Sequence, residues 1–237
     1  MYKHSNTGKF FNTEAKYSPK NLEDFVFPSN DVKRTVTAYA SGEVTRPLIL
    51  SGRNGTGKSL LARLIPKAIE KREDVVVSEI KAYKLNSDKD VDEMFTRNKM
   101  FDTHFTINGQ RYSYYIVEEM NVCIKGRNSF RVVLDKFMGI DLTIITTNEV
   151  AQIDKGIRSR CEVLEVPACP PALFFPHAKK IMEKENIDIS DAALMSALEA
   201  TYSMAPDNRG YYKVLDSLFR EFVLAQPALQ KMQAELA

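Results

Sequence analysis

Short apolar runs alternate with segments of helical periodicity along most of the chain. The runs are rich in β-branched residues and predict buried strands, and the segments between them carry apolar residues at helical spacing. The predicted strands are residues 47–50, 74–80, 114–117, 142–147 and 162–166, and the predicted helices include 60–65, 90–101 and 130–137. Strands that alternate with helices predict an α/β fold with a largely parallel sheet.

The two ends of the chain follow different patterns. Residues 1–20 mix polar and aromatic residues without a clear period, so we expect an N-terminal arm there. Asn21 is predicted to cap a short helix that begins with residues 22–24, and residues 29–31 to cap a second helix over 32–39. Between two of the strands, Asn108-Gly109 predicts a hairpin within 103–112.

A break follows the last predicted strand. Neither Pro170 nor Pro171 can donate a backbone hydrogen bond, and beyond them the pattern is helical only. We therefore expect three parts: an arm (1–20), an α/β core (21–167) and a small all-helical lid domain (168–237).

The run GRNGTGKS, from Gly52 to Ser59, lies between the first predicted strand and a helix and has the phosphate-binding pattern G-x-x-x-x-G-K-[ST]. Glycines allow such a loop to approach a triphosphate, so that backbone N–H groups and a helix N-terminus point at it. Lys58 is predicted to contact the β- and γ-phosphates, and Ser59 to bind Mg²⁺. The predicted ATP-binding residues are Asn54, Gly55, Thr56, Gly57, Lys58, Ser59 and Leu60. The alternative is an ordinary glycine-rich turn.

Polar residues follow two other predicted strands, and parallel sheets bind ligands at the carboxyl ends of their strands. Glu118 and Glu119 come directly after the strand 114–117. In this position the first acid is expected to hold Mg²⁺ through water, and the second to orient the attacking water. Asn148 follows the strand 142–147, where its amide could bridge that water and the γ-phosphate. Alternatively, the glutamates end a strand at the surface and Asn148 is a turn residue.

Composition narrows the possible classes of protein. The 237 residues are 44% hydrophobic, enough to bury a substantial core, and contain neither an apolar run of membrane-spanning length nor a signal peptide. The three cysteines form no C-x-x-C pair, so we expect no disulfide framework or zinc site. We expect a cytoplasmic protein that is not secreted. Its net charge of +2 does not by itself indicate a nucleic-acid partner.

Several motifs together resemble one family, the AAA+ ATPases of the clamp-loader group, which are the replication factor C small subunits and their bacteriophage counterparts. The resemblance extends from a K-Y-S-P motif at residues 16–19 to Arg209, and its most specific element is the S-R-C motif at residues 159–161. The run NSFRVVLD at 128–135 is similar to the family's N-A-L-R-R-x-M-E helix.

The resemblance implies roles for further residues. It makes Arg160 the arginine that reaches the γ-phosphate bound by the neighbouring subunit, and Arg209 the second-sensor arginine on the lid. Val26 and Phe27 match positions that line the adenine pocket. From the residues alone, Arg160 could instead be a surface arginine beside Arg158, and Arg209 part of a turn between two helices.

The chain departs from the family at two places. Glu118 stands where the family usually has aspartate, so slow hydrolysis is one expectation. The sequence ends at Ala237, whereas clamp-loader subunits continue into a helical collar. We expect no C-terminal collar domain within this sequence, so either this chain is a piece of a longer one or it is a compact relative that assembles through its ATPase faces.

Basic residues follow two of the predicted strands. Lys81, Lys84, Lys125 and Arg127 lie in regions that face the central channel in the family and could contact DNA phosphates without selecting a base sequence. The alternative is a set of solvated loop cations.

The resemblance thus implies an enzyme that hydrolyses ATP, with Mg²⁺, to ADP and phosphate. It would act within a homo- or hetero-oligomeric AAA+ ring on a sliding clamp and primer–template DNA, in a bacterial or virus-infected host cytoplasm. The alternatives are an ATP-dependent remodeller of protein or nucleoprotein complexes built on the same core, and a nucleotide switch that hydrolyses slowly.

Overall fold

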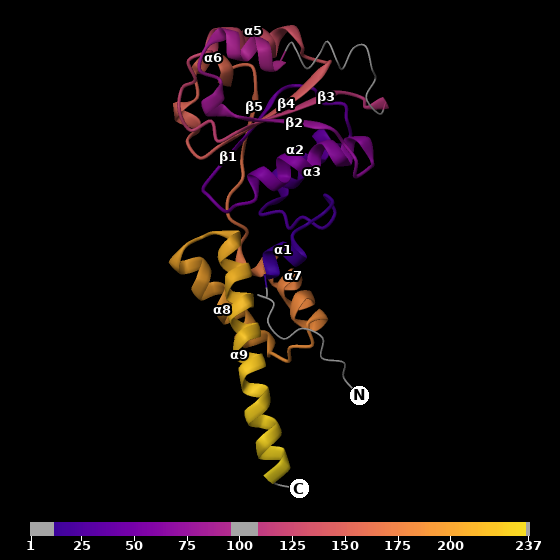
Figure 1. Ribbon diagram of the computed structural model, residues 1–237, viewed down its shortest axis with the longest axis vertical. Helices are drawn as coiled ribbons and strands as arrows, with labels where there is room; N and C mark the ends of the chain where they lie inside the picture. Colours follow the sequence, from indigo (N-terminus) through magenta and orange to yellow (C-terminus); the bar gives the residue numbers. More distant parts are fainter. Residues whose placement is uncertain (1–11, 96–108, 236–237) are drawn as a thin grey trace. The chain divides into compact units, whose positions relative to one another are not determined.

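The computed structural model describes residues 12–95 and 109–235 (Figure 1). These residues divide into two compact units, Pro19–Ala168 and a helical unit made of residues 12–18 together with those from Cys169 onward. The helix predicted over 90–101 is seen as far as residue 95. Its remainder, and residues 103–108 of the predicted hairpin at 103–112, lie outside the described residues.

The first unit is built on a parallel sheet, as the alternating pattern predicts. The strand order is β2-β3-β4-β1-β5, and every pairing is parallel. The strands are β1 (Leu48–Ser51), β2 (Val77–Lys81), β3 (Ser113–Glu118), β4 (Asp141–Thr147) and β5 (Glu162–Glu165). The predicted α/β class is therefore confirmed.

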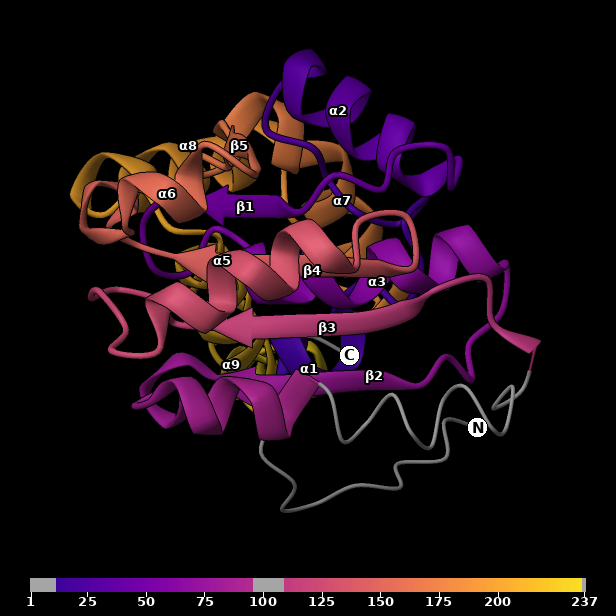
Figure 2. The same cartoon turned by 90° about the horizontal axis from the view of Figure 1, so that it is seen from above.

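Helices cover both faces of this sheet (Figures 1 and 2). One face carries α2 (Asn30–Ala40) and α3 (Lys58–Glu70), and the other carries α5 (Arg127–Lys136) and α6 (Lys155–Arg158). Because successive strand residues point to opposite faces, β1 contributes to both cores. Leu48 and Leu50 pack with α2 and α3, and Ile49 packs with α5 and α6.

The strand register places three carboxyl ends at one edge of the sheet. Ser51, the last residue of β1, pairs with Thr147, the last residue of β4, and Val117 near the end of β3 pairs with Ile145 of β4. The residues that follow these strands therefore begin at the same edge.

One predicted helix does not form. Residues 22–24 lie in turns and bends, and the Asn21 side chain accepts a hydrogen bond from the Asp24 backbone N–H at 2.9 Å. The asparagine thus makes the bond to the third residue that an N-cap residue makes, but only one turn follows, in which the Phe25 N–H donates to the Leu22 carbonyl oxygen at 3.2 Å. By contrast, Ser29 accepts from the Val32 N–H and caps α2 as predicted.

The helical unit contains α1 (Thr13–Tyr17), α7 (Pro171–Lys184), α8 (Asp191–Met204) and α9 (Asn208–Glu235). Its core includes Phe174 and Tyr211, whose rings stack with centroids 4.5 Å apart. The Thr13 N–H donates to Asp216 on α9, which ties α1 into the unit. Within the described residues, no helix is long and apolar enough to cross a membrane.

Candidate functional site

The loop between β1 and α3 has the backbone shape that the phosphate-binding pattern predicts. Gly52, Gly55 and Gly57 have φ angles of 143°, 79° and 95°, a region that favours glycine. A side chain at Gly52 would collide with the Val166 carbonyl oxygen, and one at Gly57 would meet the Phe25 ring at 3.2 Å. These glycines therefore allow both the fold of the loop and its close packing. α3, of 13 residues, begins directly after the loop and directs its N-terminus toward it.

Lys58 is buried within this loop. Its ammonium group donates to the carbonyl oxygens of Gly52 at 2.8 Å and Arg53 at 2.6 Å. The Thr56 hydroxyl donates to the same Arg53 carbonyl at 3.1 Å. The cation thus lies across the loop, among the backbone groups that a phosphate would approach.

The two glutamates after β3 lie in different surroundings. Glu118 is buried, and its two carboxylate oxygens lie 2.7 Å from Arg63 Nη2 and 2.7 Å from Lys81 Nζ. Glu119 has a left-handed backbone with a φ of 60°, and its side chain is 67% exposed. Glu118 is therefore neutralised by two cations, while Glu119 faces solvent.

Arg63 was not predicted from the sequence, although it lies one helical turn after Ser59. It donates to the Ser59 carbonyl at 3.3 Å and pairs with Glu79 at 2.6 and 2.8 Å as well as with Glu118. The bond to Glu79, followed by the charge of Glu118, raises the pKa of Arg63, and Arg63 in turn lowers the pKa of Glu79. The bond to Glu118 raises the pKa of Lys81. A spacing of four residues from Ser59 could have indicated that Arg63 shares its helix face.

The donor atoms near Ser59 and Glu118 suit Mg²⁺. A hydroxyl and a carboxylate are hard oxygen ligands, and Arg63 touches both residues. Among the residues that the structure describes, no three His, Cys, Asp or Glu side chains are grouped to hold a metal by themselves.

Asn148 lies at the end of β4, between the phosphate loop and the acidic pair. Its backbone N–H donates to Asn121 Oδ1 at 2.7 Å, and the Thr147 hydroxyl reaches the same oxygen at 3.2 Å. Asn121 thus links the turn after β3 to the end of β4. Sequence reasoning missed Asn121 because its partners are 26 and 27 residues away.

Phe25 joins the segment before α2 to the phosphate loop. It packs against Gly57 and makes an edge-to-face contact with Phe27, with centroids 5.1 Å apart. Val26 lies between them and is half-buried. The structure thus places Phe25 against the phosphate loop, and the predicted adenine-binding residues Val26 and Phe27 follow it in the chain.

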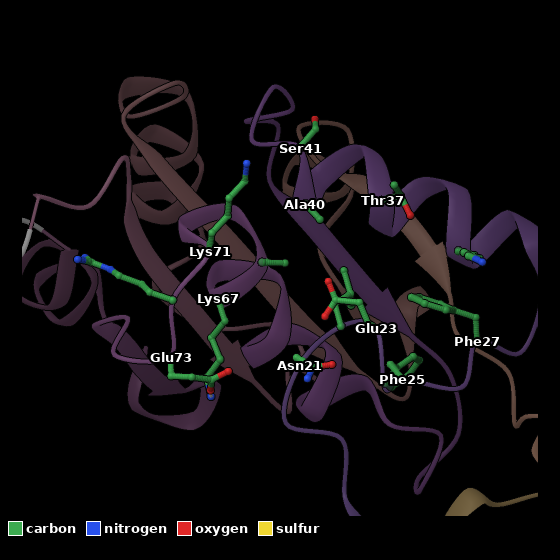
Figure 3. Close-up of a pocket in the computed structure, with 14 residues that line it drawn as sticks. Asn21, Glu23, Phe25, Phe27, Thr37, Ala40, Ser41, Lys67, Lys71 and Glu73 are labelled. Carbon is green, nitrogen blue, oxygen red and sulfur yellow. The ribbon is translucent and has the colours of Figure 1, made fainter. Parts of the chain in front are cut away.

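A cavity of about 960 Å³ opens beside this segment, between α2 and the C-terminal half of α3. Phe25 and Phe27 lie at one end, and Lys67, Lys71 and Glu73 lie at the other (Figure 3). The cavity therefore extends away from the loop along α3.

Arg160 lies just after α6, at the edge of the first unit. It is 31% exposed and pairs with Asp135 on α5, with Nη2 and Oδ2 2.8 Å apart. Arg209 lies in the helical unit, in the first turn of α9, and pairs with Glu14 at 3.5 Å.

The four predicted DNA-binding residues come from two adjacent segments. Lys84 ends the short 3-10 helix η1 (Ala82–Lys84), and Lys125 and Arg127 flank Gly126, whose N–H donates to the Leu85 carbonyl at 3.2 Å. These three cations are exposed. Lys81 is instead engaged by Glu118 and lies 4.0 Å from Glu119. The structure thus brings the two basic segments together, with Lys81 turned toward the acidic pair.

Comparison with protein families decides the class of this fold. Residues 48–167 match the family described as "ATPase family associated with various cellular activities (AAA)". The chain belongs to the AAA family of ATPases. This AAA match begins at β1 and ends just after β5, so it covers the phosphate loop, the acidic pair, Asn148 and Arg160.

Among curated proteins, this AAA chain is 27% identical to "Probable replication factor C subunit 5" of Dictyostelium discoideum, covering 78% of the chain and 53% of that protein. It is 24% identical to the sliding-clamp-loader large subunit of Escherichia phage RB69, covering 78% and 58%. The replication factor C small subunit of Thermofilum pendens is also 24% identical, with 78% and 56% covered. The chain thus spans little more than half the length of these relatives, and the resemblance to clamp loaders is confirmed at modest identity.

A solved structure of a RuvB mutant from Thermotoga maritima has the same fold. Its TM-score is 0.66 at 15% identity, with 88% of this chain and 68% of that chain covered. This likeness supports the AAA fold and carries no information on substrate.

Proposed function

We propose that this protein binds ATP with Mg²⁺ and hydrolyses it to ADP and phosphate as one subunit of a clamp-loader type AAA+ assembly. The observation that carries the proposal is the position of the phosphate loop. It follows a strand whose carboxyl end lies at the same sheet edge as Glu118, Glu119 and Asn148. That edge is where parallel sheets bind their ligands.

ATP binding would begin with an exchange of partners at Lys58. Its ammonium group now binds two loop carbonyl groups, and phosphate oxygens would replace them as stronger, charged acceptors. The N–H groups of residues 54–60 would supply further donors, and Val26 and Phe27 would contact the adenine ring. Arg209 would add a second cation from the helical unit, a role that rests on the resemblance alone.

Ser59 and Glu118 would hold Mg²⁺, which when bound offsets negative charge on the β- and γ-phosphates. Glu118 would then give up part of its pairing with Arg63 and Lys81. Because two cations already neutralise this carboxylate, the structure also favours the slow nucleotide switch as a second candidate function.

Glu119 would orient the water that attacks the γ-phosphate and accept its proton. Its exposed side chain leaves the carboxylate accessible to such a water. Asn148 would bridge the water and the phosphate, with its backbone fixed by Asn121. Arg160 of an adjacent subunit would neutralise charge on the transferred phosphoryl group, which makes hydrolysis depend on assembly.

The partners proposed for this assembly are a sliding clamp and primer–template DNA. Support comes from the names of the relatives, which include a phage sliding-clamp-loader subunit and replication factor C subunits. Lys84, Lys125 and Arg127, with Lys81 behind them, would track DNA phosphates without selecting a sequence. The division into a core (21–167) and a lid domain (168–237) belongs to the same proposal.

The test is the ATPase rate and the assembly mass, measured together. We expect ATP to shift the protein from monomer to oligomer in native mass spectrometry, and a primer–template duplex to raise the hydrolysis rate above that with ATP alone. A rate independent of both protein concentration and DNA would contradict the clamp-loader proposal. Stimulation by a protein substrate without DNA would favour a remodeller instead, and binding with almost no turnover would favour the switch.

A further inference from the structure

Two arginine–carboxylate pairs join α5 to residues 154–160, the segment that contains α6. The arginine lies on α5 in one pair and in this segment in the other. Arg131 and Asp135 are four residues apart on α5, so they share one helix face. Arg131 pairs with Asp154 at 2.6 Å, and Asp135 pairs with Arg160 at 2.8 Å. Each segment thus supplies one cation and one anion to the contact.

The ion pair between Arg131 and Asp154 stabilises the N-terminus of α6. Asp154 caps α6 by accepting from the Gly156 and Ile157 N–H groups at 2.8 and 3.2 Å. The hydrogen bond from Arg131 lowers the pKa of Asp154, so the cap stays ionised. Gly156 leaves room for the arginine, because a side chain there would collide with the Arg131 guanidinium. The backbone that leads to Arg160 is therefore well fixed.

Arg160 is held through all three of its guanidinium nitrogens. Nε lies 2.9 and 2.8 Å from the two Asp135 oxygens, and Nη2 lies 2.8 Å from one of them. Nη1 donates to the Gly156 carbonyl at 2.7 Å. Arg46 fixes the backbone from behind by donating to the Ser159 carbonyl at 3.0 Å. The donors that a phosphate would need are thus already engaged.

The pair between Asp135 and Arg160 is nevertheless easy to exchange. The side chains are 52% and 31% exposed, and exposed ion pairs contribute little to stability. A phosphate offers more charge than a carboxylate and binds arginine in the same bidentate manner. Val132, three residues before Asp135 on α5, is 61% exposed.

We propose that Asp135 is a positioning residue that holds Arg160 at rest and competes with a neighbouring subunit's γ-phosphate for the same guanidinium. This inference rests on the proposed function of Arg160. Assembly must then break the pair with Asp135 before Arg160 can act, so Asp135 sets the protein concentration at which hydrolysis begins.

The experiment is a series of ATPase rates against protein concentration for the full chain and its Asp135→Asn variant. We expect Asp135→Asn to lower the concentration for half-maximal rate about three- to fivefold, the range available to an exposed ion pair. Sedimentation with a non-hydrolysable ATP analogue should show the same shift, which is a readout independent of turnover. Asp135→Ala should act in the same direction. The matched control is Asp31→Asn, which removes an exposed ion pair with Arg34 on α2. It should change neither the half-maximal concentration nor the sedimentation.

The double variant Asp135→Asn/Arg160→Ala separates the possible failures. It should behave as Arg160→Ala alone, because the effect of Asp135 passes through that arginine. Provided that Arg160→Ala has lost its rate, three results would overturn this inference and leave the proposed function standing. They are an unchanged half-maximal concentration for Asp135→Asn, a weaker assembly of Asp135→Asn, and a shift that persists in the double variant. A full rate for Arg160→Ala would overturn the proposed cross-subunit role, and this inference with it.

Discussion

The phosphate loop and the edge formed by α5 and α6 are built in contrasting ways. The loop is one contiguous segment, and its shape depends on glycine backbone angles and on Lys58 bound to loop carbonyl groups. The edge joins residues between 131 and 160 through side-chain ion pairs, and the pair that holds Arg160 is partly exposed. The backbone of the loop is thus preorganised, whereas the edge is held by side-chain ion pairs whose partners can be replaced.

This contrast predicts which step each region controls. A preorganised loop should govern binding of nucleotide by a single subunit, and an exchangeable surface pair should govern only steps that need a second subunit. The variants below test that separation.

Lys58→Ala should have the largest effect and abolish ATP binding. The substitution removes the only full positive charge that the loop turns inward, and loss of such a charge-assisted contact weakens binding about 100-fold or more. Isothermal titration with an ATP analogue measures this. Lys67→Ala, at the other end of α3 and paired with Glu73, is the matched control and should bind normally. Tight binding by Lys58→Ala would remove the loop from the site.

Arg160→Ala should leave ATP binding within about twofold and lower the hydrolysis rate of the assembly about 1,000-fold, the range seen for arginines supplied by a partner. Steady-state phosphate release at high protein concentration measures the rate. Arg158→Ala, at the last residue of α6, is the matched control and should retain the rate. Equal loss of binding in Lys58→Ala and Arg160→Ala would contradict the separation of the two regions.

Glu119→Gln should lower hydrolysis about 100-fold while ATP stays bound. The amide keeps the shape of the side chain and loses the capacity to accept a proton from water. A single-turnover assay with pre-bound ATP isolates this step from binding. Comparable single-turnover rates for Glu119→Gln and the unsubstituted chain would assign the base to another residue.

Asn121→Ala should have a smaller effect, about 1 kcal/mol of unfolding free energy and about a tenfold loss of hydrolysis. The substitution leaves the Asn148 N–H without its acceptor, whereas the Thr147 hydroxyl keeps the Met120 carbonyl oxygen at 2.8 Å. Chemical denaturation and phosphate release measure the two effects. A rate loss without any change in stability would indicate that Asn121 contacts the reacting groups itself.

The smallest effects concern the thiols. Cys161 and Cys169 are buried, which raises the pKa of each to about 12, whereas Cys123 is exposed. At pH 8, iodoacetamide should modify Cys123 in the folded protein and the other two only after unfolding, as intact-mass measurement would show. Because both folded-state pKa values exceed the ordinary value of 9.0, these thiols contribute stability that is complete at neutral pH and declines from about pH 9 to about pH 12. Rapid modification of Cys161 at pH 8 would contradict its burial.

Features set by local sequence could be predicted. β4 was expected over 142–147 and runs from Asp141 to Thr147, because β-branched residues between two polar ends define a buried strand. The phosphate loop was predicted from its glycines, and its positive φ angles agree with that basis. The helix expected from residue 22 shows the limit, because the Asn21 side chain makes the predicted cap bond to the Asp24 N–H but the backbone continues for a single turn only.

Contacts between residues far apart in the sequence could not be predicted. The contact between Arg63 and Glu118 requires α3 to cross the end of β3, 55 residues later in the chain. The partners of Asp135 and Asn121 depend in the same way on which segments the sheet order brings together. The identity of these residues was visible in the sequence, but nothing in their spacing fixed the partner.

The left-handed backbone of Glu119, directly after β3, has a consequence for chain length at this junction. Glu119 has a φ of 60° and is open to water, whereas the preceding Glu118 is enclosed by the guanidinium group of Arg63 and the ammonium group of Lys81. Inserting a single residue within β3 would shift its register and move Glu118 away from Arg63 and Lys81. The count of residues in β3 is therefore under as strict a constraint as their chemistry.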